Sequence, residues 1–151
     1  MESETSTRSR SLIWLYLVAA VAILGLVVWT SLRTLRDSPN REASVDLPGM
    51  GFVTVQFSTD PSPPLPSGTV QLNFMPANSR NVMVDLGPAL PFAYGYKGSE
   101  TPVGSGQAVL DSMGMNYQAG VQFPGVGDYW VAIDVGGGEE VRFQFYVEPA
   151  Q

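Results

Sequence analysis

The chain has 151 residues and a net charge of −6 at pH 7, and it contains neither cysteine nor histidine. The lack of cysteine excludes a disulfide framework, thiolate metal sites and haem attachment through a Cys-x-x-Cys-His motif. The lack of histidine removes the commonest general base and metal ligand, so no Ser–His or Cys–His nucleophile pair can form. The composition therefore predicts a protein that is not an enzyme and that holds neither a metal nor a cofactor.

The first part of the chain has the pattern of a membrane anchor. Residues 1–10 are polar and rich in Ser and Thr, and we expect a disordered N-terminus there. Residues 11–32 carry no charge, and as a helix they would be about 33 Å long, against about 30 Å for the hydrocarbon core of a bilayer. Trp14 and Trp29 suit the two membrane interfaces. We predict a transmembrane helix over residues 11–33, with the bilayer as its first partner.

The apolar segment is longer than the central region of a cleaved signal peptide, which spans about 7–15 residues. The one small-x-small site, Ala20-x-Ala22, lies in the middle of the apolar segment. We therefore expect an uncleaved anchor. Arginines flank both ends of it, so the positive-inside rule does not fix its orientation.

Residues 34–50 are charged and contain Pro39, and we expect a linker that ends the helix soon after Arg36. Beyond it the apolar residues recur with the period of two that is typical of strands. The alternating segments are residues 52–58, 69–74, 82–86, 92–96, 107–110, 117–123, 129–135 and 141–147. They predict an all-β fold for residues 51–151, an Ig-like antiparallel β-sandwich of about seven to eight strands.

Two biased segments lie between the predicted strands. The run Gly136–Gly138 separates the last two strands and predicts a hairpin. Residues 60–68 contain two Pro-x-x-Pro spacings and predict an extended polyproline II loop. No basic residue lies near it, so we expect a stiff connection that blocks edge pairing rather than a ligand for a recognition module.

From residue 43 onward the chain has ten acidic and three basic side chains, a net charge of −7. Such a domain repels phosphate backbones and anionic head groups. Nucleic acid is therefore excluded as the expected partner.

The candidates for chemistry are few. Met113 and Met115 are two residues apart, and thioether sulfurs are soft ligands that suit Cu(I), although Met is also an ordinary residue of cores. The acidic residues stand in predicted turns, where carboxylates are usually solvated, and Lys97 is expected to be a loop lysine. Nothing in the sequence brings two carboxylates to one cleft, so we expect no small-molecule substrate.

Aromatic residues are expected mainly in the core. Trp130 alternates with Tyr129, Val131 and Ile133, so if those three point inward Trp130 lies on the opposite face. An exposed aromatic residue there would mark a partner surface.

Short motifs follow one another in a recognisable order. They are Phe52–Phe57, the proline-rich turn Pro61–Pro66, Gly68 and Val70–Phe74, and later Asp111–Met115, Tyr117–Phe123 and Pro124–Ile133. This order, with a methionine-containing loop, a strand, a Gly-x-Trp-type turn and a strand running into the last hairpin, resembles that of FixH/YtkA-like domains. With the single N-terminal helix, the resemblance covers roughly residues 12–33 and 52–148.

The resemblance implies an Ig-like sandwich on the outer (periplasmic or extracellular) side of the cell membrane, linked to respiratory oxidase assembly or copper handling. The chain departs from the family's pattern because it has no His or Cys, which leaves the scaffold role. We expect a non-catalytic, single-pass accessory or assembly subunit of a larger respiratory or photosynthetic electron-transfer complex, acting by protein–protein docking. The alternatives are a periplasmic Cu(I)-binding module that uses Met113 and Met115, and a free-standing surface or adhesion domain.

Overall fold

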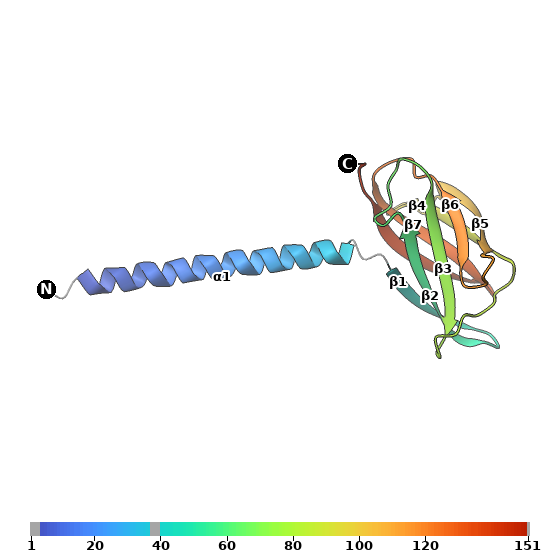
Figure 1. The fold of residues 1–151 in the computed structure, drawn as a ribbon, viewed down its shortest axis with the longest axis horizontal. Coiled ribbons are helices and arrows are strands. Elements are labelled where there is room, and N and C mark those ends of the chain that lie inside the picture. Colours follow the sequence, from blue (N-terminus) through green and yellow to red (C-terminus); the bar gives the residue numbers. More distant parts are fainter. Residues whose placement is uncertain (1–3, 37–39, 151) are drawn as a thin grey trace. The chain divides into compact units, whose positions relative to one another are not determined.

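The computed structural model describes residues 4–36 and 40–150 (Figure 1). Helix α1 runs from Glu4 to Arg36 and forms one compact unit, and the β-rich remainder forms the other. Disorder is predicted for residues 1–10, but residues 4–10 are helical, and residues 1–3 lie outside the described residues.

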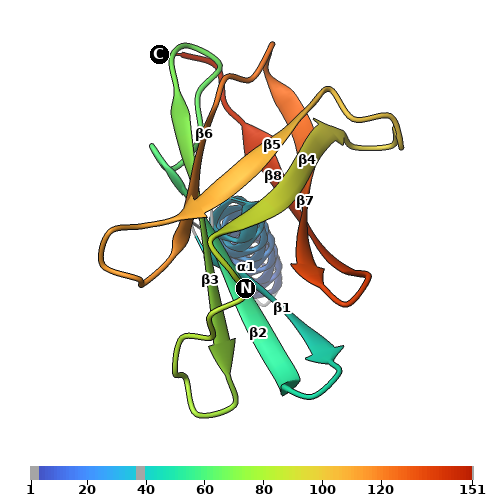
Figure 2. The same cartoon turned by 90° about the vertical axis from the view of Figure 1, so that its right-hand side faces the viewer.

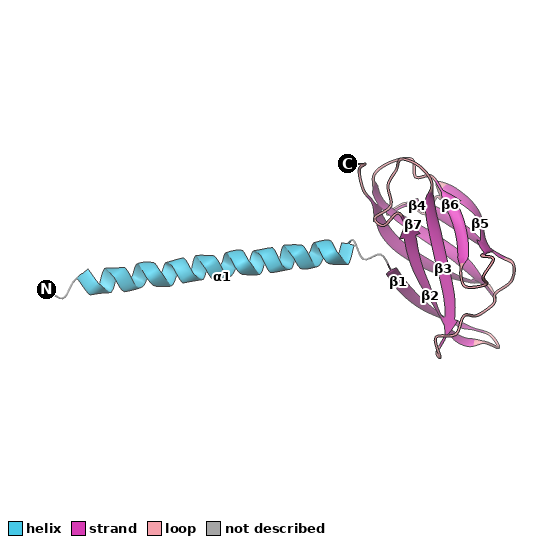
Figure 3. Cartoon of the chain, viewed as in Figure 1, coloured by secondary structure: helices cyan, strands magenta, loops and turns pink. Residues whose placement is uncertain are grey.

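The second unit consists of eight antiparallel strands in one hydrogen-bonded sheet (Figure 3), which confirms the predicted all-β class. The order across the sheet is β1-β2-β3-β6-β5-β4-β7-β8. The strands are β1 Asn40–Leu47, β2 Gly51–Asp60, β3 Val70–Asn78, β4 Ala89–Tyr96, β5 Gly104–Leu110, β6 Tyr117–Val121, β7 Gly127–Gly136 and β8 Glu139–Val147.

The sheet folds over on itself into two layers. The junction lies between β5 and β6, where only Val109↔Gln118 and Leu110↔Tyr117 pair. Figure 2 shows β5 crossing from the β6 side to the β4 side of the domain. The layers are thus β1-β2-β3-β6 and β5-β4-β7-β8, and the end strands β1 and β8 lie close together.

The strand order is that of an Ig-like sandwich. In such folds strands A, B and E share one layer and C, F and G the other. Here β2, β3 and β6 take the first set of places and β4, β7 and β8 the second, with β1 as an additional strand. The Tyr129 hydroxyl, near the start of β7, donates a hydrogen bond of 3.0 Å to the carbonyl of Gly125, which is the tyrosine corner of Ig-like domains.

The core follows the predicted alternation. Phe57 of β2 lies 5.1 Å from Phe143 and 5.5 Å from Phe145 of β8, ring centre to ring centre, so aromatic rings bridge the two layers. The other large side chains that are almost fully buried include Val53, Val55, Val70, Leu72, Phe74, Tyr117, Tyr129, Val131, Ile133 and Val147.

Two boundaries differ from the sequence prediction. The expected linker over residues 34–50 contains β1, whose residues Ala43, Val45 and Leu47 face the core while the acidic and hydroxyl side chains between them face outward. The expected strand over residues 82–86 is only an isolated bridge between Ala77 and Met83. The strand number was therefore right although one predicted strand was wrong.

Of the two predicted connections between strands, one is confirmed and one differs from the prediction. The hairpin at Gly136–Gly138 is confirmed, with positive φ at the two turn residues Gly137 and Gly138 as in a type I′ turn. The proline-rich loop is not a continuous polyproline II helix: it bends, and the Asp60–Pro61 and Ser62–Pro63 peptide bonds are cis.

Replacement of Tyr129 by Phe tests the tyrosine corner. The variant keeps the buried ring but leaves the Gly125 carbonyl without its partner, so the free energy of unfolding should fall by about 1 kcal/mol. Denaturant unfolding of the purified protein measures this. Tyr94→Phe is the matched control, because its hydroxyl makes only a long contact of 3.4 Å with the carbonyl of Gln122. An equal loss in both variants would contradict the assignment.

Candidate interaction surfaces

Helix α1 contains a segment that is long and apolar enough to cross a membrane. Trp14–Leu32 spans 19 residues, about 29 Å at about 1.5 Å per residue, and every side chain in it is exposed. Near its end the hydroxyl of Thr30 donates to the carbonyls of Leu26 and Val27 and so needs no water. The segment therefore offers a continuous apolar surface.

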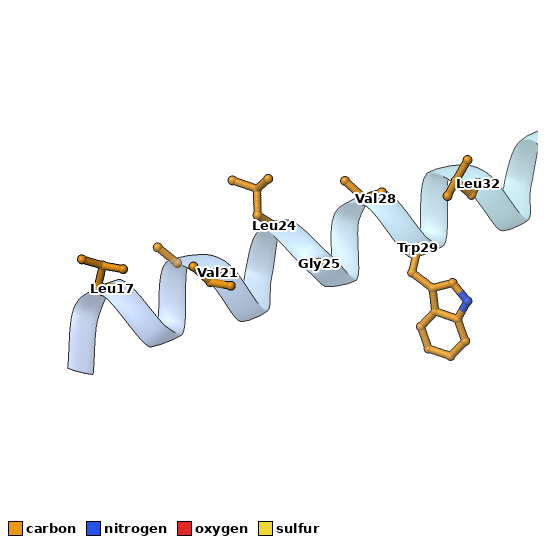
Figure 4. Close-up of a pocket in the computed structure, with 8 residues that line it drawn as sticks. Leu17, Val21, Leu24, Gly25, Val28, Trp29 and Leu32 are labelled. Atoms are coloured by element: carbon orange, nitrogen blue, oxygen red, sulfur yellow. The ribbon is translucent and has the colours of Figure 1, made fainter. Parts of the chain in front are cut away.

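One side of this helix is hollowed. Leu17, Leu24, Val28 and Leu32 project from the upper side in Figure 4, with Gly25 between them on the near surface and the indole of Trp29 on the lower side. These side chains, with Ala20 and Val21, line an open groove of about 540 Å³. A Cβ added at Gly25 would meet nothing within 4 Å. The groove gives a second helix room for close approach, as small residues do in membrane helix pairs.

The predicted methionine pair lies on a turn between β5 and β6. Met113 is 81 % exposed and Met115 is 55 % exposed, so neither is a core residue. The carboxylate of Asp111 accepts a hydrogen bond of 2.7 Å from the Met115 amide, and Gly114 takes the positive φ of 66° that the turn requires. The turn is thus fixed by its own hydrogen bonds.

Met115 shares a hollow with Met75 rather than with Met113. The hollow has a volume of about 170 Å³ and lies on the outer face of β2 and β3, beside the start of β6. Besides the two methionines, it is lined by Gln56, Phe57, Ser58, Asn73 and Asn116. The alternation of Met75 with the inward residue Phe74 indicates that Met75 faces outward, but no local pattern in the sequence places it beside Met115.

The outer face around this hollow is rich in neutral polar side chains. Gln71 donates to Gln118 at 3.2 Å, and Gln118 donates to the Asn116 side chain at 3.2 Å. Towards β1, the hydroxyls of Ser44 and Thr54 lie 2.8 Å apart. The Gln56 side chain, which lines the hollow, donates to the carboxylate of Glu42 at 2.9 Å, so this polar outer face becomes acidic along β1.

The opposite layer has a covered outer face, which corrects the prediction for Trp130. Tyr129, Val131 and Ile133 do point into the core, and Trp130 does lie on the other face, but it is only 5 % exposed. Its indole N–H donates to the carbonyl of Ser99 at 2.8 Å. Trp130 therefore holds the connection between β4 and β5 and offers no exposed aromatic surface.

Charged and small residues complete the cover over Trp130. The guanidinium of Arg142 lies 4.5 Å from the centre of the Trp130 ring and pairs with Glu100 at 3.2 Å and Glu140 at 3.3 Å. Burial lowers the pKa of Arg142, but the hydrogen bonds to the two glutamates outweigh this and raise it. Gly95 on β4 makes room, because a Cβ there would lie 2.8 Å from the ring.

Two buried tyrosines serve the fold rather than a reaction. Burial raises the pKa of Tyr129 well above its ordinary value, and contact with Tyr96 raises it further. Burial also raises the pKa of Tyr117, whose hydroxyl donates to the carbonyl of Gly87 and accepts from the amide of Leu86. Both hydroxyls therefore stay protonated and fasten loops to strands.

The acidic side chains of the turns and Lys97 do not come together in one site. Asp111 closes the methionine turn, Glu140 pairs with Arg142, and Lys97 is exposed on the connection after β4. Within residues 4–36 and 40–150, no group of three or more His, Cys, Asp or Glu side chains could hold a metal ion.

No protein-family model, curated protein or solved structure matches this sequence. The resemblance to FixH/YtkA-like domains is not tested by these comparisons and stays a prediction.

Replacement of Gly95 by Ala tests the packing of Trp130. The added methyl would clash with the indole and with the Thr101 carbonyl 3.0 Å away, so the variant should lose about 1–3 kcal/mol of stability. Thermal unfolding measures the loss. Gly125→Ala is the control, because a Cβ there meets nothing within 4 Å and its φ is not positive. Equal stability of both variants would refute this packing role.

Proposed function

We propose that the protein is a non-catalytic, single-pass membrane subunit that docks onto a larger integral-membrane electron-transfer complex and holds its β-domain on the outer side. The observation that carries this proposal is the exposed apolar segment of α1 with its groove around Gly25. A membrane covers such a segment, and the groove supplies a place for a partner helix.

The β-domain supports the same proposal. Its acidic composition disfavours nucleic acid and anionic lipid surfaces, and the polar outer face of β2 and β3 suits contact with protein. The resemblance to FixH/YtkA-like domains suggests the respiratory or photosynthetic setting. The protein's role is then to be held in place by helix packing and to contact the complex with its domain.

The groove predicts a specific dependence on residue size. Gly25→Leu fills the groove and should lower co-purification with the complex by about tenfold or more, the equivalent of about 1.4 kcal/mol. The measurement is the ratio of haem- or pigment-bearing subunits to the tagged full-length protein after extraction in a gentle detergent. Ala19→Leu is the control, because Ala19 lies outside the groove and the substitution also adds bulk.

Three outcomes separate the candidates. Loss of co-purification in the Gly25 variant alone would support the docking role. Equal losses in both variants would mean that any added bulk disturbs the helix and would contradict the groove. A wild-type protein that is extracted alone would overturn the subunit proposal and favour the free-standing surface or adhesion domain.

A Cu(I)-binding module is a second candidate, and one observation favours it: Met75 and Met115 line the same hollow. Thioether sulfurs suit Cu(I). Titration of the purified protein with Cu(I) under anaerobic conditions should then show binding that falls by about tenfold or more in Met115→Leu and Met75→Leu. Met50→Leu is the control, because Met50 lies on the turn between β1 and β2, outside the hollow. No binding below the micromolar range would exclude this candidate.

A further inference from the structure

The loops at one end of the β-domain gather exposed apolar side chains. Because neighbouring strands are antiparallel, the connections from β2 to β3, from β4 to β5 and from β6 to β7 all lie at the end of the domain where β1 begins. We call this end the proximal end. The opposite end, with the other four connections, lies one strand length away, about 26–34 Å for the strands of eight to ten residues.

Two exposed apolar side chains meet through Tyr129 at the proximal end. Tyr96 is the last residue of β4 and is 41 % exposed, and its ring centre lies 4.7 Å from that of Tyr129. The Tyr129 hydroxyl donates to the carbonyl of Gly125 at 3.0 Å, and the next residue, Val126, is 44 % exposed. Tyr96 and Val126 are therefore held close to the same buried ring and need little ordering when they make a contact.

The proline-rich loop lies at the same end. The carbonyl of Pro64 accepts a hydrogen bond of 2.9 Å from the amide of Glu148, directly after the end of β8, where β8 pairs with the start of β7. Residues 61–69 and 122–127, which form the β2–β3 and β6–β7 connections, carry no charged side chain. These two loops therefore present an uncharged surface at the proximal end.

The length of the chain between α1 and β1 decides which end is held near a membrane. Exposure alone does not decide, because Phe52 and Val82 are exposed at the opposite end. The three residues between Arg36 and Asn40 span at most about 14 Å even when fully extended, and Arg36 lies about 6 Å along the helix from Leu32, where the apolar segment ends. If α1 crosses a bilayer, the start of β1 therefore lies within about 20 Å of the hydrocarbon core, and the head groups occupy about 5–8 Å of that distance. The proximal end alone is held this close by the chain itself.

We propose that the proximal end rests on the surface of the bilayer that α1 spans, with Tyr96 and Val126 inserted among zwitterionic head groups. Tyrosine suits this depth because one end of its side chain is apolar and the other is polar. The proposal rests on the membrane anchor of the proposed function. It adds a contact between the β-domain and lipid that uses neither the groove of α1 nor the polar outer face of β2 and β3.

The charges at the proximal end select the kind of lipid. The carboxylates of Asp60, Asp128 and Glu148 stand where β2 ends, where β7 begins and directly after β8. They outnumber Arg41 and Lys97, which also stand there, so an anionic lipid surface is disfavoured and a zwitterionic one fits. Exchange of phosphatidylcholine for phosphatidylglycerol should therefore weaken the contact, and higher salt should reduce this effect.

Fluorescence quenching by spin-labelled lipid tests the proposal, because the chain has no cysteine that would compete for a label. Full-length Val126→Cys is labelled with a fluorophore and reconstituted in phosphatidylcholine nanodiscs in which some head groups carry a nitroxide. Val82→Cys, an exposed valine on the connection from β3 to β4 at the opposite end, is the matched control. The nitroxide should quench the Val126 label at least about twofold more than the Val82 label, because its range is shorter than the strands that separate the two ends.

A second measurement removes the apolar contact. With the label at Ser67→Cys on the proline-rich loop, Val126→Asp should lower the quenching about twofold or more, because a carboxylate is costly to bury in the interface. Val126 is exposed, so the variant keeps its core, and Val82→Asp is the control. Quenching of the Val82 label that equals or exceeds that of the Val126 label would overturn the proposal, and so would unchanged quenching in Val126→Asp.

The nanodiscs hold no other protein, so the result does not depend on docking onto a complex. Failure of the full-length protein to co-purify with a complex would overturn the docking function and leave the lipid contact in place. A protein that does not remain with the nanodiscs would overturn the membrane anchor, and with it both proposals.

Discussion

The two layers of the β-domain are joined through a set of aromatic rings centred on Phe57. This ring contacts Phe74 in its own layer and Phe143 and Phe145 in the other, at centre-to-centre distances of 5.1–5.5 Å. Aromatic rings of this size fill the space between the two layers of a β-sandwich. Because the inner faces supply the core, the outer faces of the two layers are free to differ.

The outer faces of the two layers differ in whether their side chains are covered. Over β4, β7 and β8 the face is closed, because Trp130 lies between Gly95 and Arg142 and binds the carbonyl of Ser99. Over β2, β3 and β6 the face is open and polar, with a hollow and the exposed ring of Phe52. Burying β7 on both sides stabilises one layer, whereas the outer face of the other layer stays exposed.

Much of the fold could be predicted from the spacing of the apolar residues alone. Alternation placed the inward faces of β2, β7 and β8 correctly, and the uncharged stretch predicted α1. β1 was missed because its apolar residues are small and lie between charges, so its alternation is weak until β2 pairs with it. Alternation placed Trp130 on the outer face, but the hypothesis that it is exposed there is wrong, because a loop about thirty residues away in sequence covers it and no local pattern contains that contact. The hollow that Met75 and Met115 line could not be predicted for the same reason, since only the pairing of β3 with β6 brings these two residues together.

The place of β1 in the chain has a mechanical consequence. Three residues separate it from α1, so a pull applied through α1 would reach β1 before the rest of the domain. Its eight pairs with β2 have hydrogen bonds perpendicular to the strand. A force directed along β1 therefore loads these bonds together in shear instead of breaking them one after another. The strand that the sequence pattern missed is thus the element that would resist a pull applied through α1.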